Sequence, residues 1–309
     1  MGISVRHVSK SYGKVDALVD VSFEVHPGEI FGLIGPDGAG KTTLFHILTT
    51  LLLQDQGQAT VAGFDVNNDY RSIRGQVGYM PGRFSLYQDL TVAENLNFFA
   101  TIFGTTLAEN YDLIKEIYVQ IEPFKGRRAG KLSGGMKQKL ALCCALIHKP
   151  KVLFLDEPTT GVDPVSRKEF WDMLKRLQLK GITILVSTPY MDEAALCDRI
   201  ALMMNGKILQ IDTPQAIVSS FPFIIYNVKT AETYRLIQDL AGYAKTHSAY
   251  PFGEYLHFTS SANDFKAGEL VAYLKEKKHK QIVVSETQPS IEDTFMELSK
   301  QPKTVSNEQ

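Results

Sequence analysis

The chain has 309 residues, of which 44% are hydrophobic and 22% charged, an ordinary composition for a globular protein with one large domain or a large and a small one. Its net charge of -1 gives no broad basic surface for nucleic acid, and no apolar run approaches the roughly 20 residues of a membrane-spanning helix. The three cysteines, Cys143, Cys144 and Cys197, lack metal-ligand spacing and are expected to be buried thiols. We therefore expect a cytoplasmic protein that reaches a membrane only through a partner.

The first 80 residues carry strand patterns interrupted by one helix. Alternating apolar and polar side chains over residues 1–30 predict half-buried antiparallel strands. A short apolar strand, Glu29–Ile34, leads into a glycine-rich loop, and apolar residues at helical spacing predict a helix over Lys41–Leu53. Two further strands are expected at Gln58–Val61 and Gln76–Tyr79.

A helical region and a second set of strands follow. The pattern is helical over residues 91–147, and Thr91 with Glu94 three residues later marks a helix start. Beyond it, strands and helices alternate, which predicts a mostly parallel α/β sheet. The predicted strands are Val152–Leu155, Ile182–Val186 and Ile200–Met204, and the helices between them are Ser166–Leu179 and Met191–Cys197.

The character of the chain changes near residue 220. The order of elements becomes βαββαβ plus a helix, which predicts a small ferredoxin-like α+β domain. Its strands are expected at Phe223–Val228, Ala244–Ser248, Tyr255–Ser260 and Gln281–Ser285, and its helices at Ala231–Leu240, Asp264–Glu276 and Ser290–Ser299. We expect domains at 1–217 and 218–300 and a polar, disordered tail at 301–309.

A phosphate-loop pattern, G-x-x-x-x-G-K-[ST], lies between the strand that ends at Ile34 and the helix that follows it. The residues are Gly35, Pro36, Asp37, Gly38, Ala39, Gly40, Lys41, Thr42 and Thr43. Glycines let backbone N–H groups turn toward phosphates, and the helix start adds the positive end of its dipole. Lys41 would supply a cation to the β- and γ-phosphates, and Thr42 a hydroxyl to Mg²⁺. A chance match is the alternative, but the flanking strand and helix favour ATP binding.

Two further motifs carry chemistry. Four apolar residues run into Asp156 and Glu157, and because neighbouring strand residues face opposite ways, the two acids are expected to do different jobs. Asp156 would hold the Mg²⁺ shell, and Glu157 would polarise the attacking water. Leu132-Ser133-Gly134-Gly135-Met136 precedes a predicted helix and offers amide groups to an anion, although such a loop is common by itself.

Together the three motifs resemble the nucleotide-binding domain of ABC transporters over residues 1 to about 215. The resemblance implies an α/β phosphate-loop ATPase with a parallel core sheet, an antiparallel β subdomain and a helical subdomain at about 84–148. Two such domains face each other in that family, so that ATP on one phosphate loop is closed by the other domain's signature loop, here Leu132–Met136.

The resemblance also implies roles for three further segments. Tyr12 would stack on adenine, with a plain strand-end tyrosine as the alternative. Gly161, Val162 and Asp163 would form the D-loop at the dimer interface, and Phe84–Leu90 would lie where the helical subdomain receives the membrane subunit.

Two stretches are similar to a subgroup of the family. Pro289–Phe295 resembles a closing motif of ATPase subunits that drive ABC-2-type exporters, and Gly130–Leu140, with the phosphate loop, resembles the first cassette of multidrug exporters with two unequal cassettes. This implies an exporter ATPase that uses ATP and Mg²⁺ and lies on the inner face of the cell membrane. Its partners would be transmembrane permease subunits and a second cassette, not nucleic acid.

Two positions depart from the family pattern. Gly82 stands where the family has a glutamine that contacts Mg²⁺ and water, and Pro189 where it has a histidine that contacts the γ-phosphate. Neither side chain can donate or accept a hydrogen bond, so hydrolysis at this chain's own site is expected to be slow. The signature loop could still complete a competent site on a fully equipped partner, which favours a heterodimer.

Other interpretations stay open. A homodimeric ATPase would result if neighbouring side chains substitute for the two missing ones; the candidates are Arg83, Gln88, Ser187 and Thr188. A regulatory nucleotide-binding module and a soluble ABC-type protein without a transporter are the remaining alternatives.

Overall fold

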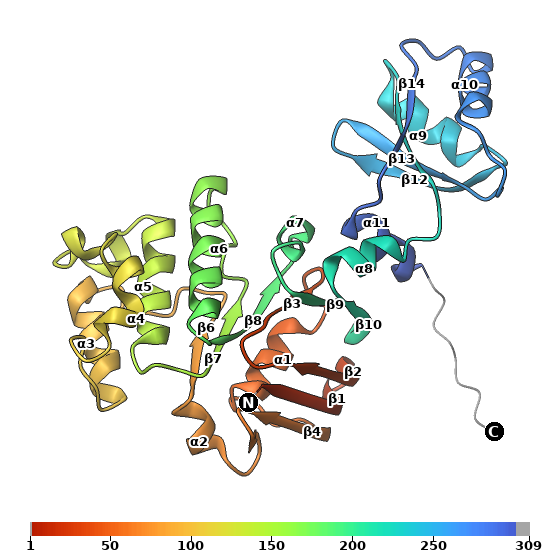
Figure 1. The fold of residues 1–309 in the computed structure, drawn as a ribbon. Coiled ribbons are helices and arrows are strands. Elements are labelled where there is room, and N and C mark those ends of the chain that lie inside the picture. Colours follow the sequence, from red (N-terminus) through yellow and green to blue (C-terminus); the bar gives the residue numbers. More distant parts are fainter. Residues whose placement is uncertain (1, 301–309) are drawn as a thin grey trace, which may run out of the picture. The chain divides into compact units, whose positions relative to one another are not determined.

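The computed structural model describes residues 2–300, which form two compact units (Figure 1). The first unit ends at Gln215 and the second begins at Ala216. The predicted tail at 301–309 lies outside the described residues.

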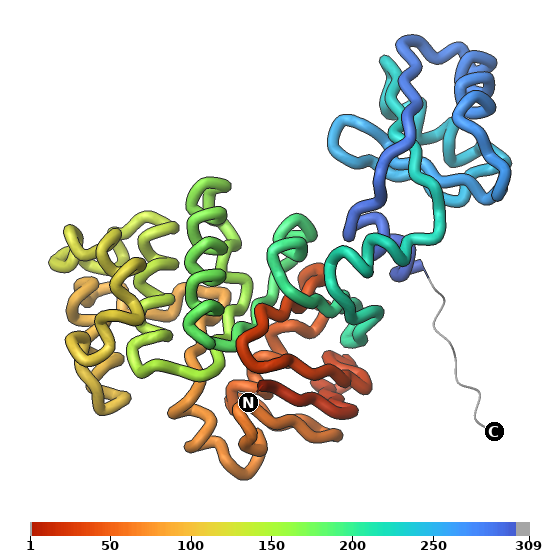
Figure 2. Tube along the Cα trace, in the orientation of Figure 1, coloured from red at the N-terminus to blue at the C-terminus, as the bar shows by residue number. Residues whose placement is uncertain are grey.

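A six-stranded sheet forms the centre of the first unit, in the order β10-β9-β3-β8-β7-β6. Its strands are β3 (Ile30–Ile34), β6 (Val77–Met80), β7 (Val152–Asp156), β8 (Thr183–Thr188), β9 (Arg199–Met204) and β10 (Lys207–Asp212). All neighbours run parallel except β10, which pairs antiparallel with β9 and was not predicted. Figure 2 shows β3, from the start of the chain, between two strands from much later in the sequence. The prediction of a mostly parallel α/β sheet is therefore confirmed.

An antiparallel sheet, in the order β2-β1-β4-β5, supports the central one. Its strands are β1 (Ile3–Tyr12), β2 (Val15–Val25), β4 (Gln56–Val61) and β5 (Phe64–Asp65), which confirms antiparallel strands within residues 1–30. Helix α1 (Lys41–Leu48) packs between the two sheets, where Phe45 meets Phe154 edge to face with 5.8 Å between ring centroids. The helix ends five residues earlier than predicted, because Thr50 adopts a left-handed φ of 62°.

The remaining helices of this unit lie between the strands of the central sheet along the chain. They are α2 (Tyr70–Arg74), α3 (Val92–Ile102), α4 (Tyr111–Tyr118), the 3-10 helices η1 (Glu122–Phe124) and η2 (Ala129–Lys131), α5 (Gly134–Leu146), α6 (Pro164–Leu179) and α7 (Met191–Ala194). The predicted capping box at the start of α3 is present, with Thr91 and Glu94 bonded reciprocally. The cysteines are buried as predicted, Cys143 and Cys144 within α5.

The second unit has the predicted ferredoxin-like topology, an antiparallel sheet in the order β12-β13-β11-β14. Helix α8 (Pro214–Ser219) spans the boundary between the units. The elements of the second unit beyond it are β11 (Ile225–Lys229), α9 (Thr233–Ala241), β12 (Thr246–Phe252), β13 (Tyr255–Ser260), α10 (Ala267–Glu276), β14 (Val283–Thr287) and α11 (Ile291–Ser299). Helices α9 and α10 cover one face through Leu236, Leu240, Leu270 and Leu274.

Helix α11 is fastened to the sheet of the second unit by a buried carboxylate. Asp293, which has no exposed surface, lies 2.6 Å from Nδ1 of His257 and also accepts hydrogen bonds from Tyr250 and Ser290. Burial opposes the charge of Asp293, but these hydrogen bonds outweigh it and hold the pKa of the carboxyl below its ordinary value.

None of the helices in residues 2–300 combines the length and apolar character that crossing a membrane requires.

Candidate nucleotide-binding site

The phosphate loop lies at the carboxyl end of β3 and turns directly into α1. Gly40 is the residue before the helix and has φ 103°, a conformation that L residues rarely adopt. A Cβ at Gly40 would lie 2.4 Å from the carbonyl oxygen of Ala17, and one at Gly35 would lie 2.1 Å from that of Met203. Space therefore requires a glycine at both positions, and at Gly40 the backbone conformation requires it as well.

Lys41 holds its ammonium group inside this loop. The residue is only 3% exposed, and Nζ donates to the carbonyl oxygens of Gly35 at 2.8 Å and Pro36 at 3.0 Å. A third contact, 3.2 Å, joins Nζ to Oε1 of Glu157. The cation thus lies between the loop and the second predicted acid, with two hydrogen bonds to the loop and an ion pair to the acid.

The two acids lie at the end of β7, although not as strand alternation would place them. Asp156 is the last residue of β7, is buried, and accepts a hydrogen bond of 2.6 Å from the Ser187 hydroxyl. Glu157 lies beyond the strand with a φ of 50°, so the turn directs its side chain, and the argument from alternating strand residues was wrong. The N–H of Glu157 is held by the carbonyl and the hydroxyl of Ser187, both at 3.1 Å.

Gly82 lies beside these acids. A Cβ on this residue would come within 3.1 Å of the Asp156 carbonyl oxygen and 3.8 Å of Cβ of Glu157. Pro189 directly follows Thr188, whose carbonyl oxygen accepts a hydrogen bond of 3.3 Å from Gly35 N–H. Of the two positions that depart from the family pattern, Gly82 therefore borders the acids, and Pro189 is next to a residue that is bonded to the phosphate loop.

Four neighbouring residues were candidates to replace the side chains missing at Gly82 and Pro189, and three of them are hydrogen-bonded to other residues of the chain. Ser187 donates to Asp156, and the Thr188 hydroxyl donates to Glu193 at 2.6 Å. The Gln88 carbonyl accepts from Gly130 in the helical region, and Arg83 is exposed.

The signature loop and the D-loop come together away from the phosphate loop. Ser133 is exposed and caps α5, its Oγ accepting from Met136 N–H at 3.4 Å, and a Cβ on Gly135 would lie 3.0 Å from the Ser166 hydroxyl oxygen in α6. Asp163 caps α6 by accepting from the N–H groups of Val165 and Ser166, and these bonds lower the pKa of its carboxyl.

The other members of these motifs have simple placements. Leu132 is buried, Gly134 is exposed, and Gly161 takes a left-handed φ of 73°. Tyr12 is 50% exposed at the end of β1, in the hairpin whose second strand carries Ala17 beside Gly40.

Glu193, Thr159 and Arg167, which no motif singled out, form a network with Thr188 next to the phosphate loop. Glu193, in α7, accepts from the hydroxyls of Thr159 and Thr188 and lies 3.5 Å from Nε of Arg167. The sequence predicted only a helix over Met191–Cys197 here, because burial of a glutamate in a short helix leaves no local pattern.

An apolar hollow of about 430 Å³ lies between β6, the following loop and helices α3 and α5. Among its lining residues are Leu51, Leu86, Phe99, Phe103, Tyr79 and His148. Exposed aromatic side chains continue the apolar surface, with the rings of Tyr87 and Phe98 meeting edge to face at 4.8 Å. Within residues 2–300, Tyr79 Oη and His148 Nδ1 are buried without a hydrogen-bond partner.

The segment that borders this hollow is fastened to the helical region by Asn95. The amide of Asn95 is fully buried, accepts from Tyr87 N–H at 3.1 Å and donates to the carbonyl oxygens of Tyr87, Leu90 and Thr91. The carbonyls of Gln88 and Leu90 in turn accept from Gly130 and Ala129, in the helix just before the signature loop.

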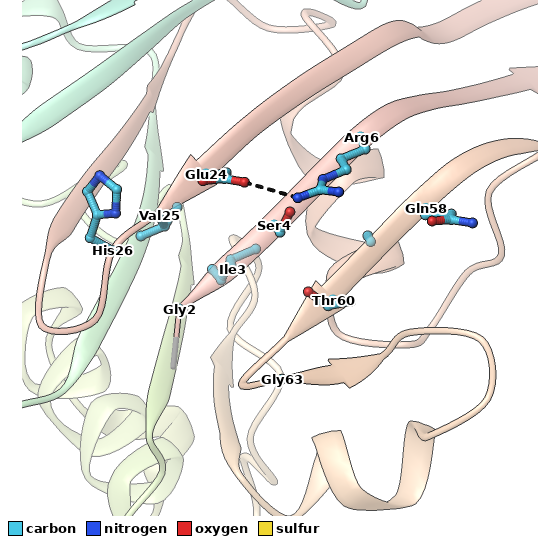
Figure 3. Close-up of a pocket in the computed structure, with 11 residues that line it drawn as sticks. Gly2, Ile3, Ser4, Arg6, Glu24, Val25, His26, Gln58, Thr60 and Gly63 are labelled. Atoms are coloured by element: carbon cyan, nitrogen blue, oxygen red, sulfur yellow. Dashed lines mark ion pairs between the residues drawn. The ribbon is translucent and has the colours of Figure 1, made fainter.

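A second hollow of about 430 Å³ lies over the outer face of the antiparallel sheet (Figure 3). Arg6 and Glu24 form an ion pair of 3.5 Å across neighbouring strands there. None of the predicted site residues lines this surface, so the candidate site is the one around Lys41.

Comparisons with known proteins agree with this geometry. Residues 18–160 match the family described as "ABC transporter". "Probable multidrug ABC transporter ATP-binding protein YbhF" of Escherichia coli is 45% identical over 223 residues, 71% of this chain and 38% of that protein. "Nod factor export ATP-binding protein I" of Burkholderia lata is 39% identical over 221 residues, 71% of this chain and 73% of that protein.

A solved structure is similar to the first unit. The dimeric post-hydrolysis state of the ATP-binding cassette MJ0796, bound to ADP and Pi, matches with a TM-score of 0.62 at 25% identity, over 68% of this chain and 98% of that one. The coverage of the relatives is uneven, since this chain spans only 38% of the length of the Escherichia coli protein.

Proposed function

Since the chain belongs to the ABC transporter family, we propose that it is an ATP-binding and ATP-hydrolysing subunit that powers an ABC-2-type exporter. The observation that carries the proposal is the phosphate loop with the buried ammonium of Lys41 at its centre and the carboxylate of Glu157 3.2 Å away. A phosphate-sized anion entering this loop would meet a cation and the N-terminus of α1 together. Two relatives with multidrug and Nod factor export in their names support the transport role.

The side chains at the site fit ATP with Mg²⁺. The Thr42 hydroxyl is exposed at the start of α1, and Asp156 supplies a carboxylate held in place by Ser187. Both are oxygen ligands of the kind Mg²⁺ prefers, with phosphate oxygens completing the shell. Bound Mg²⁺ would neutralise charge on the phosphates, and Glu157 would orient the attacking water.

Hydrolysis at this chain's own site is proposed to be slow. Gly82 borders the two acids and Pro189 follows the residue bonded to Gly35, so both missing side chains would have faced the nucleotide. The engagement of Ser187 and Thr188 with Asp156 and Glu193 makes them poor substitutes. The exposed Ser133 would close ATP on a second, fully equipped cassette, so a heterodimer is the assembly we favour. The dimeric MJ0796 structure supports the pairing of cassettes in general.

The membrane partner is proposed to bind at the apolar hollow beside Leu86 and Phe103. Exposed aromatic rings around a hollow are typical of a protein interface. With permease subunits bound there, the chain would lie on the inner face of the cell membrane.

A regulatory nucleotide-binding module with little ATPase activity is the second candidate, and the loss of both polar side chains at Gly82 and Pro189 favours it. The chain should be purified alone and together with a candidate partner cassette and candidate permease subunits, and ATP turnover compared. Rapid turnover by the isolated chain would contradict the heterodimer. Glu157→Gln is expected to reduce turnover of the assembly far less than the same change in the partner cassette, and equal losses would contradict the asymmetry.

A further inference from the structure

Glu193 is the most deeply buried charged side chain near the site, with 1% exposure, and the proposed mechanism does not use it. Its two carboxylate oxygens have different partners: Oε1 accepts from Thr159 Oγ1 at 2.7 Å and Oε2 from Thr188 Oγ1 at 2.6 Å. We propose that Glu193 is a positioning residue that joins the phosphate loop to the D-loop, so that nucleotide binding changes the surface this chain presents to a second cassette.

One end of this connection reaches the phosphate loop. Thr188 is the last residue of β8, and its carbonyl oxygen accepts the 3.3 Å hydrogen bond from Gly35, the first residue of the loop. A change in the loop's backbone on nucleotide binding is therefore passed to Thr188 and, through its hydroxyl, to Glu193.

The other end reaches the D-loop. Thr159 follows Glu157 by two residues, and its carbonyl oxygen accepts from Val162 N–H at 3.1 Å. Val162 lies between Gly161 and Asp163, the residue that caps α6. The conformation of the D-loop thus depends on where Glu193 holds Thr159.

Arg167 completes the network from α6. Its Nε is 3.5 Å from Oε1 of Glu193, its NH1 is 3.6 Å from Asp192, and its guanidinium lies 4.2 Å from the ring centroid of Tyr190. A buried carboxylate is costly unless it is paired and hydrogen-bonded. Glu193 meets this condition through the hydrogen bonds from Thr159 and Thr188 and through the nearby charge of Arg167. The segments carrying these three residues are therefore expected to move as one body, which includes Pro189 next to Thr188.

This inference rests on the proposed nucleotide binding, and the test measures the two separately in the full-length chain. Binding of ATP with Mg²⁺ is measured by titration, and hydrogen exchange of residues 159–166 is measured with and without saturating ATP. The variants are Thr159→Val, which removes one hydroxyl at constant shape, and Thr159→Ser, which keeps the hydroxyl. Asp293→Asn is the matched control, because it disturbs an equally buried carboxylate in the other unit.

In the wild-type chain, ATP is expected to slow exchange of residues 159–166 about fivefold, the low end of ordinary coupling between two sites. Thr159→Val should bind ATP within about twofold of wild type and lose that response, while Thr159→Ser and Asp293→Asn should keep it. Glu193→Gln should behave as Thr159→Val does. A merely structural role would instead raise exchange throughout the unit and weaken ATP binding in parallel.

Two results would overturn the inference. If Thr159→Val and Thr159→Ser both bind ATP and show the same exchange response, the inference is overturned and the proposed function stands. Failure of the wild-type chain to bind ATP would overturn the proposed function and this inference with it.

Discussion

Removing the charge of Glu157 is expected to tighten nucleotide binding to the isolated chain. The ammonium of Lys41 already has three acceptors, namely the carbonyl oxygens of Gly35 and Pro36 and the carboxylate of Glu157. A phosphate oxygen can bind Lys41 only if one of these contacts is given up, and the contact with Glu157 is the longest of the three. Glu157→Gln therefore removes a competitor of the nucleotide.

The size of the effect follows from the kind of contact that is lost. The Lys41–Glu157 contact is an ion pair of 3.2 Å whose Glu157 side chain is 23% exposed. A partly exposed ion pair contributes about 1 kcal/mol, which corresponds to an affinity about fivefold higher. The same contact stabilises the nucleotide-free chain, which should lose a similar free energy of unfolding in the variant.

Two measurements on the full-length chain test this prediction. Fluorescent ADP and ATP analogues are titrated into wild type and Glu157→Gln, and denaturant unfolding is followed without nucleotide. Glu169→Gln serves as the control, because it removes an acid from a more exposed ion pair, with Lys139 at 2.9 Å, away from the loop. It should change neither quantity appreciably.

An alternative explanation predicts a different pattern. If Glu157 acted only by repelling phosphates, the variant would gain more affinity for ATP than for ADP, and its nucleotide-free stability would equal that of wild type. That combination would refute the competition for Lys41.

Three further predictions concern stability. Gly82→Ala should lower the free energy of unfolding by about 1 kcal/mol, because its Cβ would press on the Asp156 carbonyl oxygen. Denaturant unfolding measures this against the control Gly126→Ala, whose Cβ meets open space. Equal free energies of unfolding for the two variants would contradict the close contact at Gly82. Asp293→Asn should cost at least about 2 kcal/mol because it weakens hydrogen bonds to a buried charge, and a melting temperature equal to wild type would show that the network contributes little. Burial lowers the pKa of His148 in the folded chain, and the hydrogen bond to Val77 opposes this only in part. As the pH drops below about 6.5, the unfolded chain therefore takes up a proton before the folded chain does, and the free energy of unfolding should fall. His148→Phe should reduce this fall, and parallel curves for variant and wild type between pH 7.5 and 5.5 would exclude the effect.

The parts of the fold that local patterns encode were predictable. The strands around the phosphate loop, the capped start of α3 and the ferredoxin-like order of the second unit follow from hydrophobic periodicity and turn residues, which act over a few positions. Boundaries were less accurate where a single backbone conformation decides them. The φ of Thr50 ends α1 early, and β12 begins at Thr246 and runs on to Phe252, beyond the predicted Ser248.

The candidate site was predictable only as far as its motifs reach. Gly35–Thr43 can be recognised from the sequence because the close approach of neighbouring backbone excludes a side chain at Gly35 and Gly40. The direction of the Glu157 side chain could not be predicted, because its φ of 50° depends on the hydrogen bonds to Ser187 in a neighbouring strand. The burial of Glu193 depends on Thr159, 34 residues away, and no periodicity records such a contact.

Hydrogen bonds through the amide of Asn95 connect the apolar hollow, where we propose that a partner binds, to the signature loop. It donates to the carbonyl oxygens of Tyr87 and Leu90. The carbonyls of Leu90 and of Gln88, next to Tyr87, accept from Ala129 and Gly130, shortly before Ser133. If a partner binds at Tyr87, as proposed, this chain of hydrogen bonds is the route by which a displacement of Tyr87 would reach Ser133. Asn95→Leu, similar in volume but without these bonds, is the substitution that would leave both surfaces present and their movements independent.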